Sequence, residues 1–155
     1  MLDPRLLYTL DEDVVAKLAD AHPVLIQQLD GFVDAGGAGR QLTSHVLEHL
    51  EHEVVATFDH DQLHDYRSRR PAMVFDTNQW KSYADLHLRL YRVVDEQGEV
   101  FLLLSGPEPD VQWERFAAAL MGLIEQLDVR LTISAHGIPM AVPHTRPITL
   151  TAHAT

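Results

Sequence analysis

Residues 23–51, PVLIQQLDGFVDAGGAGRQLTSHVLEHLE, contain the pattern that decides the fold of this chain. The segment opens with a short apolar run, Val24-Leu25-Ile26, which has the length of a buried strand rather than of a helix. Four glycines follow within nine residues: Gly31, Gly36, Gly37 and Gly39. Beyond them, apolar residues recur at helical spacing, namely Leu42, Val46, Leu47 and Leu50. A strand that enters a helix through such a turn is typical of α/β domains, whose ligands usually bind at that turn.

The composition of the chain sets limits on its class. Its 155 residues suit one domain, and its 23 acidic against 12 basic residues give a formal net charge of −11. This charge argues against a nucleic-acid-binding role, because phosphate binding needs a basic surface. No apolar run is long enough to span a bilayer, and residues 1–15 lack the features of a signal peptide. Because the chain has no cysteine, disulfide and thiolate chemistry are excluded and a cytoplasmic location is expected.

The segments around this stretch also carry strand and helix patterns. Residues 1–22 are expected to form a lead-in segment with one short helix, in which Thr9 and Glu12 fit a capping box. Strands are expected at 53–59 and 72–76, separated by a polar loop. The alternation in 84–94 and the apolar run 99–105, joined by a turn, predict an antiparallel hairpin. The sheet should therefore be mixed rather than purely parallel.

The clearest amphipathic helix is expected from Asp110, as N-cap, to Leu127. Its apolar residues repeat at spacings of three and four: Trp113, Phe116, Ala117, Leu120, Leu123, Ile124 and Leu127. We expect this face to pack on the sheet, and the small residues 117–119 to permit close approach of another subunit on a second face. Further strands are expected at 130–135 and 148–153, on either side of a proline-rich loop.

Two long helices are few for six or seven strands, since sheets of this kind are normally covered on both faces. We therefore expect either that the chain is the N-terminal part of a longer protein, or that a partner covers an exposed face.

Four blocks of the sequence resemble the proteasome assembly chaperone 2 family, most closely its actinobacterial branch. They are GFVDAGGA (31–38), DYRSRRP (65–71), LLLSGPEPDVQWERF (102–116) and HGIPMAVPHTRP (136–147), in the same order across residues 23–155. The resemblance implies a three-layer α/β/α fold with a mixed sheet, similar to the phosphorylase/hydrolase-like fold of nucleoside phosphorylases. Actinobacterial members are longer chains, which favours the interpretation that this is an N-terminal part.

The resemblance also implies a role. Members of this family associate with themselves or with paralogues, and eukaryotic and archaeal relatives chaperone proteasome assembly. Some of those relatives dock on the proteasome through a C-terminal hydrophobic–Tyr–any motif, from which the residues His153-Ala154-Thr155 depart. We therefore do not expect that mode of docking for this sequence.

Candidate ligand-binding residues lie in the glycine-rich turn and in the loops that follow predicted strands: Gly31, Asp34, Gly36, Gly37, Glu108, His136 and Arg146. The turn lacks the Lys-Ser/Thr pair of a phosphate-binding P-loop, and Leu42 stands where the dinucleotide motif needs glycine. The helix N-terminus could still bind an anion, although Asp34 opposes this and tight packing of the turn is the favoured alternative. Arg146 and His136 could hold an anionic substrate, with a structural ion pair of Arg146 as the favoured alternative.

Histidines at helical spacing, His45, His49 and His52, raise the question of a metal site. The order His-Val-Leu-Glu-His is not the zincin pattern, so a solvated stripe is favoured, and we predict neither a metal nor a cofactor. The single basic cluster, Arg67, Arg69 and Arg70, should form structural ion pairs or an interface.

No complete catalytic constellation is present, so no catalytic residue is predicted. The favoured function is therefore a non-catalytic, chaperone-like interaction protein that forms homo-oligomers and binds a protein client. The alternative is a small-molecule binding protein or enzyme, for a nucleoside- or phosphate-type ligand, related to nucleoside phosphorylases.

Overall fold

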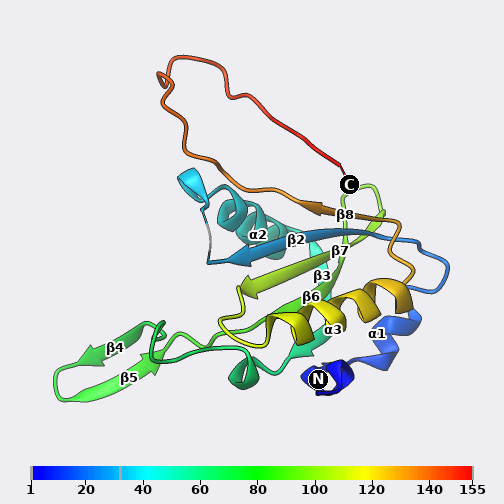
Figure 1. Cartoon of the computed structure of the whole chain (residues 1–155), viewed down its shortest axis with the longest axis horizontal. Helices are drawn as coiled ribbons and strands as arrows, with labels where there is room; N and C mark the ends of the chain where they lie inside the picture. Colours follow the sequence, from blue (N-terminus) through cyan, green and yellow to red (C-terminus); the bar gives the residue numbers. More distant parts are fainter. Residues whose placement is uncertain (1, 32, 155) are drawn as a thin grey trace.

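The computed structural model describes residues 2–31 and 33–154, and its main sheet has six strands in the order β1-β3-β6-β7-β2-β8 (Figure 1). These are β1 (Tyr8–Leu10), β2 (Val24–Asp30), β3 (Glu51–Phe58), β6 (Arg89–Val94), β7 (Val100–Pro107) and β8 (Leu131–Ser134). Strand β2 runs parallel to both β7 and β8, whereas the β1/β3, β3/β6 and β6/β7 pairs are antiparallel. The predicted mixed sheet and the predicted hairpin of β6 and β7 are thus confirmed.

Helices cover both faces of this sheet and give three layers (Figure 1). On one face, α1 (Glu12–Ala16) and α3 (Trp113–Gln126) pack over the larger core, which includes Leu25, Val55, Leu90, Leu102, Leu104, Phe116 and Leu123. On the other face, α2 (Ala38–His49) packs over a smaller core of Val46, Val93 and Leu103 with their half-buried neighbours. The three-layer α/β/α architecture is therefore as expected.

The start of α2 depends on glycine. The short 3-10 helix η2 (Ala35–Gly37) leads into it, and both Gly36 and Gly37 lie in the left-handed region, with φ of 70° and 65°. Residues with a Cβ adopt this conformation only at a cost, so the two glycines allow strand β2 to turn sharply into the helix.

Helix α3 begins later than predicted. Its N-cap is Gln112, in a left-handed conformation with φ of 58°, rather than Asp110. The carboxylate of Asp110 instead accepts a hydrogen bond from the Asp65 N–H at 2.9 Å. The predicted apolar face is confirmed at Phe116, Leu120, Leu123 and Leu127, which are buried. It is wrong at Trp113, which is 44% exposed, and at Ala117, which is also exposed.

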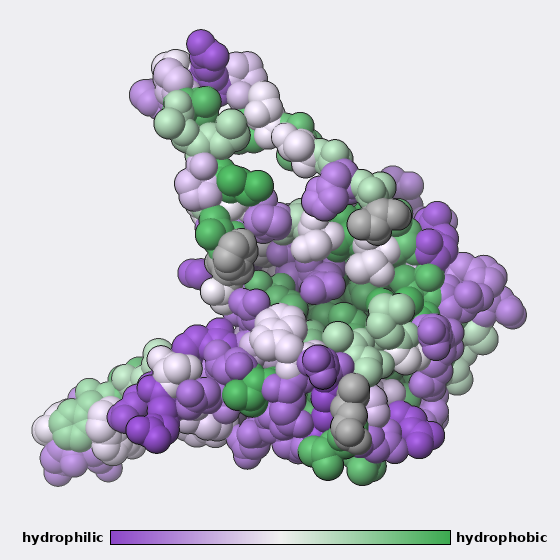
Figure 2. Space-filling model, in the orientation of Figure 1, coloured by the Kyte–Doolittle hydropathy of each residue, from purple (hydrophilic) through white to green (hydrophobic). Residues whose placement is uncertain are grey.

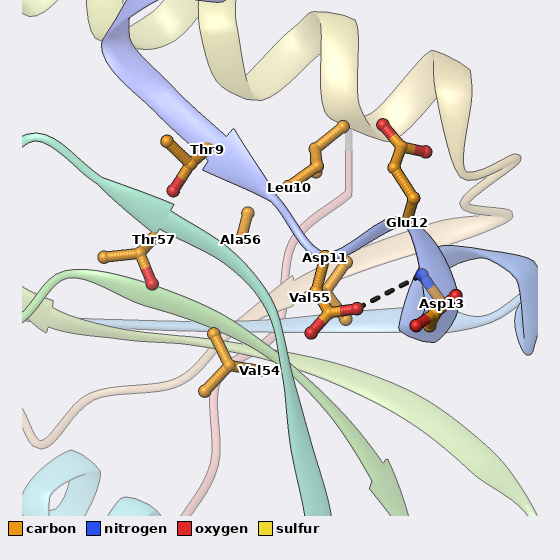
Figure 3. Close-up of a pocket in the computed structure, with 9 residues that line it drawn as sticks. All are labelled: Thr9, Leu10, Asp11, Glu12, Asp13, Val54, Val55, Ala56 and Thr57. Carbon is orange, nitrogen blue, oxygen red and sulfur yellow. Dashed lines mark hydrogen bonds between the residues drawn. The ribbon is translucent and has the colours of Figure 1, made fainter.

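The lead-in segment contains an unpredicted strand, β1, preceded by a 3-10 helix, η1 (Pro4–Leu7). The predicted capping box is wrong, because Thr9 lies within β1 and Asp11 is the N-cap of α1. The Asp11 carboxylate accepts a hydrogen bond from the Asp13 N–H at 3.1 Å (Figure 3) and another from the Val14 N–H at 3.2 Å. Beside it, an open hollow of about 460 Å³ lies near Val54 and Ala56, where the register between β3 and β6 shifts.

Two segments differ most from expectation. Strand β4 (Met73–Asp76), within the predicted strand 72–76, is absent from the main sheet and pairs only with β5 (Gln79–Tyr83), which was not predicted. This hairpin stands away from the body as an arm (Figure 1). The predicted strand 148–153 is wrong: no strand is formed between 148 and 154, and Ile148 is 95% exposed. A strand needs hydrogen-bonding neighbours, and the structure offers none to this segment.

The remaining short element is the 3-10 helix η3 (His60–Gln62), which lies in the polar loop after β3. Among the described residues, no helix combines the length and the apolar character needed to cross a membrane.

Candidate functional site

The loops that follow β7, β2 and β8 meet around one pocket of about 270 Å³. Because β2 lies between two parallel neighbours, the carboxyl ends of all three strands come to the same edge of the sheet, which is where α/β proteins bind ligands. Four of the predicted candidate residues line this pocket: Gly31, Asp34, Glu108 and His136. Three others, Gly36, Gly37 and Arg146, do not line it.

Asp34 occupies the N-terminus of helix α2. Its carboxylate accepts hydrogen bonds from the N–H groups of Gly39 at 3.0 Å and Arg40 at 3.3 Å. The bond from Gly39 is the main cause that lowers the pKa of Asp34 below its ordinary value, with the Gly137 and Arg40 N–H groups adding to it against a smaller opposing effect of burial. The helix end therefore already holds a negative charge, which leaves it poorly suited to a phosphate.

Gly31 lets two loops approach closely. A Cβ at this position would lie 2.5 Å from Glu108 Oε2 and 2.7 Å from Glu108 Cβ. The backbone of the two loops is joined there, since the Glu108 N–H donates to the carbonyl of Asp30 at 2.8 Å. Gly31 thus serves the packing of the pocket wall, and Glu108 is held against it.

Arg69 holds together the loops that carry Asp30 and Glu108. Its guanidinium forms an ion pair with Asp110 at 2.8 Å and donates to the carbonyl oxygens of Asp30 and Glu108. Burial opposes ionisation of Asp110, but the Asp65 N–H and the Arg69 guanidinium outweigh it and keep the pKa of Asp110 below its ordinary value. For Arg69, the predicted structural ion pair is confirmed.

The segment after β8 closes the opposite side. The Gly137 N–H donates to Asp34 Oδ1 at 3.2 Å, and the Ala35 N–H donates to the Gly137 carbonyl at 2.8 Å. A Cβ at Gly137 would lie 2.1 Å from the Ala35 oxygen, so only glycine fits there without a shift of the backbone. This tie places His136 at the rim, whereas Arg146 lies further along the loop and is exposed.

Sequence reasoning missed several residues that line the pocket: Gln27, Gln28, Asp30, Arg40 and Trp113. One signal could have found the first two. The pair Gln27-Gln28 interrupts an otherwise apolar strand, and a buried polar side chain normally needs a partner or a task. Trp113 was missed because its helical spacing is that of a core residue.

The histidines do not form the predicted helical stripe. His45 and His49 stack on α2 with ring centroids 4.6 Å apart, but His52 lies in β3, edge-on to Tyr91. In the parts of the chain that the structure describes, no group of three or more His, Asp, Glu or Cys side chains could hold a metal ion.

Comparison with known proteins shows which solved structures the chain resembles. A protein of unknown function from Mycobacterium tuberculosis is 47% identical with a TM-score of 0.87, covering 95% of this chain and 51% of that one. One from Corynebacterium glutamicum, also of unknown function, is 42% identical with a TM-score of 0.83, covering 91% and 53%. A Mycobacterium tuberculosis proteasome-assembly chaperone homologue, 22% identical with a TM-score of 0.70, covers 80% and 53% and shares the fold.

This chain therefore spans about half the length of the solved structures that it matches. No protein with a curated description matches it. The model of one family, described as the PAC2 family, matches residues 28–155. Since this match covers most of the sequence, the chain belongs to the PAC2 family.

Proposed function

We propose that the chain is a non-catalytic, chaperone-like interaction protein of the cytoplasm that assembles with copies of itself. The observation that carries this proposal is the arm, β4 and β5. Every residue of both strands is exposed, including five large apolar ones at 54–63%: Met73, Val74, Phe75, Trp80 and Tyr83. In Figure 2 the arm carries apolar residues well away from the body.

An arm of this kind is poorly suited to remain alone in water. A two-stranded hairpin is marginally stable by itself, and contiguous exposed apolar surface usually marks a protein contact. The contact between Phe75 and Trp80, with ring centroids 5.0 Å apart, is the main aromatic packing within it. Its outer edges also offer free backbone groups for strand addition.

A second copy is a suitable partner for the arm. The only charged residues of the two strands, Asp76 and Lys81, form an ion pair at 2.6 Å, so the arm is neutral in a chain of net charge −11. Two arms can therefore pack in a symmetric, isologous contact without bringing net negative charges together. Membership of a family that includes a proteasome-assembly chaperone homologue supports a chaperone-like role for such an assembly.

Sedimentation velocity at micromolar concentration tests this proposal. The chain should sediment as an oligomer, and a Phe75→Ser/Trp80→Ser variant should sediment as a monomer with an unchanged far-UV spectrum. Met121→Ser is the matched control, because Met121 is 53% exposed but lies on α3, and it should assemble like the unmodified chain. A monomeric unmodified chain, or a double variant that still assembles, would refute assembly through the arm.

A second candidate function is small-molecule binding, which one observation favours. Of the predicted candidates, Asp34, Glu108 and His136 line one pocket together with Gly31, whereas Arg146 does not. A thermal-shift screen with phosphate, nucleosides and divalent metals tests it. A ligand at a hundredfold excess over its Kd would add about 2.7 kcal/mol of stability, well within the reach of such a screen.

A further inference from the structure

The pocket at the ends of β7, β2 and β8 presents hydrogen-bond acceptors without matching donors. Gln28 shows this most clearly, since it is only 8% exposed and its Nε2 donates to the Ala135 carbonyl at 2.6 Å. Among the described residues, no hydrogen bond ends on its Oε1. A Cβ at Gly39 would lie 2.2 Å from that oxygen, so the missing side chain of Gly39 keeps the space for it.

Two carboxylates of the pocket are also without a cation. Within residues 2–31 and 33–154, no ion pair involves the carboxylate of Asp30 or of Glu108. Arg69 is close to both, but its ion pair is with Asp110 and its other bonds go to backbone oxygens. Arg40 lines the pocket and is exposed. The pocket wall therefore carries two carboxylates that have no ion-pair partner among the described residues.

Trp113 supplies an aromatic wall in the same pocket. Its indole is 44% exposed although it begins an apolar helix face, and it meets Phe116 edge-to-face at 6.0 Å between ring centroids. An exposed indole beside carboxylates attracts organic cations, because the ring face is negative and the carboxylates accept their N–H groups.

The same geometry disfavours an anion. The N–H groups of Gly39 and Arg40, which a phosphate would use at this helix end, already donate to Asp34. The volume of about 270 Å³ lies just below the usual range for drug-sized ligands, which points to a small group.

We infer that this pocket binds a small organic cation, an alkylguanidinium or alkylammonium group. Its charge lies against the Trp113 indole, and its N–H groups donate to the carboxylates of Asp30 and Glu108 and to Gln28 Oε1. This inference rests on the second candidate function and names its ligand class. The cation can be a free amine or the basic side chain of a protein, and both present the same chemistry.

Titration calorimetry on the full chain tests this with agmatine as the free ligand and acetyl-Gly-Arg-Gly-amide as the protein-borne form. Acetyl-Gly-citrulline-Gly-amide, which has nearly the shape of the arginine peptide without its charge, is the ligand control. Agmatine or the arginine peptide should bind, and the citrulline peptide should bind at least about tenfold more weakly. Which of the two cationic ligands binds more tightly identifies the source.

Variants locate the site. Glu108→Gln and Trp113→Leu should each weaken binding of the cation by about tenfold or more, with unchanged far-UV spectra. Glu114→Gln removes the same charge from a neighbouring residue of α3 that does not line the pocket, and should bind within about twofold of the unmodified chain. Equal affinities of the arginine and citrulline peptides, or unchanged binding by Glu108→Gln, would overturn the inference. Binding of phosphate or a nucleoside without binding of any cation would overturn the ligand class and leave small-molecule binding standing.

Discussion

Replacing Phe116 by alanine tests whether α3 covers the larger core. The ring is 2% exposed and packs against Phe58, with centroids 5.3 Å apart, and against Trp113. Truncating a buried phenylalanine costs about 3–5 kcal/mol, because the transfer energy is lost and a cavity remains. This is a large part of the 5–15 kcal/mol by which a typical domain is stable. With a urea m-value of about 2 kcal/mol/M, the unfolding midpoint should fall by about 1.5–2.5 M.

Urea unfolding followed by far-UV circular dichroism measures this shift. Trp113→Ala is the matched control, since it removes a larger aromatic ring from the same helix at a position that is 44% exposed. It should cost about 1 kcal/mol, as for a partly exposed residue. If Phe116→Ala lowers the midpoint no more than Trp113→Ala does, the helix does not seal the core and the packing argument is wrong.

Three further predictions concern other parts of the fold. Ala118→Glu, at a half-buried position of α3 outside the arm, should leave the melting curve and self-association in sedimentation unchanged; weakened assembly would move the interface from the arm to α3. Gly106→Ala should lower the free energy of unfolding by about 1–3 kcal/mol in urea melts, because Gly106 has a φ of 146° and the new Cβ would lie 2.2 Å from the His87 oxygen. Gly122→Ala is its control, with open space around it, and should stabilise the helix by up to about 1 kcal/mol. Folding lowers the pKa of Asp34 below its ordinary value of 3.8, so the stability that ionised Asp34 adds to the fold is complete above that pH and is lost as the pH falls through the lowered pKa. Asp34→Asn should therefore flatten this part of the stability–pH curve, and an unchanged slope would contradict the stabilising role of the Asp34 carboxylate.

Periodicity in the sequence predicted the elements that are held in place mainly by burial of their own apolar side chains. The apolar run at Val24 is β2, and the spacing from Phe116 to Leu127 marks the buried face of α3. In both elements the burial of apolar side chains is the dominant force, and it is visible in the sequence as the spacing of apolar residues.

Elements that depend on distant partners could not be predicted in this way. Asp110 has the character of an N-cap, but an ion pair with Arg69 and a bond from Asp65 take its carboxylate, and the helix begins at Trp113. Residues 148–153 have a strand-like sequence, yet the structure places no strand beside them. Tertiary contacts override the local propensity of Asp110, whereas residues 148–153 lack the partner strand that their propensity would need.

Some residues that line the pocket could be predicted from glycines and from their position in loops after strands. Gly31, Asp34, Glu108 and His136 line one pocket because they follow strands whose ends the sheet order brings together, and their role in binding stays a prediction. The position of Arg146 could not be inferred, because a long loop does not fix where its far end lies.

The charge distribution links the proposed assembly to the inferred pocket. The arm is neutral, and residues 131–155, which carry the exposed apolar residues Leu131 and Ile133, contain no acidic residue at all. The arm and residues 131–155 are thus the parts of this acidic chain through which two copies can meet without strong charge repulsion. The pocket, by contrast, concentrates uncompensated carboxylates. Because salt screens charges but hardly weakens apolar contacts, assembly through the arm should persist in high salt while binding of a cation weakens. The two interactions therefore differ in their dependence on salt, and a single titration with sodium chloride can distinguish self-association through the arm from binding of a cation in the pocket.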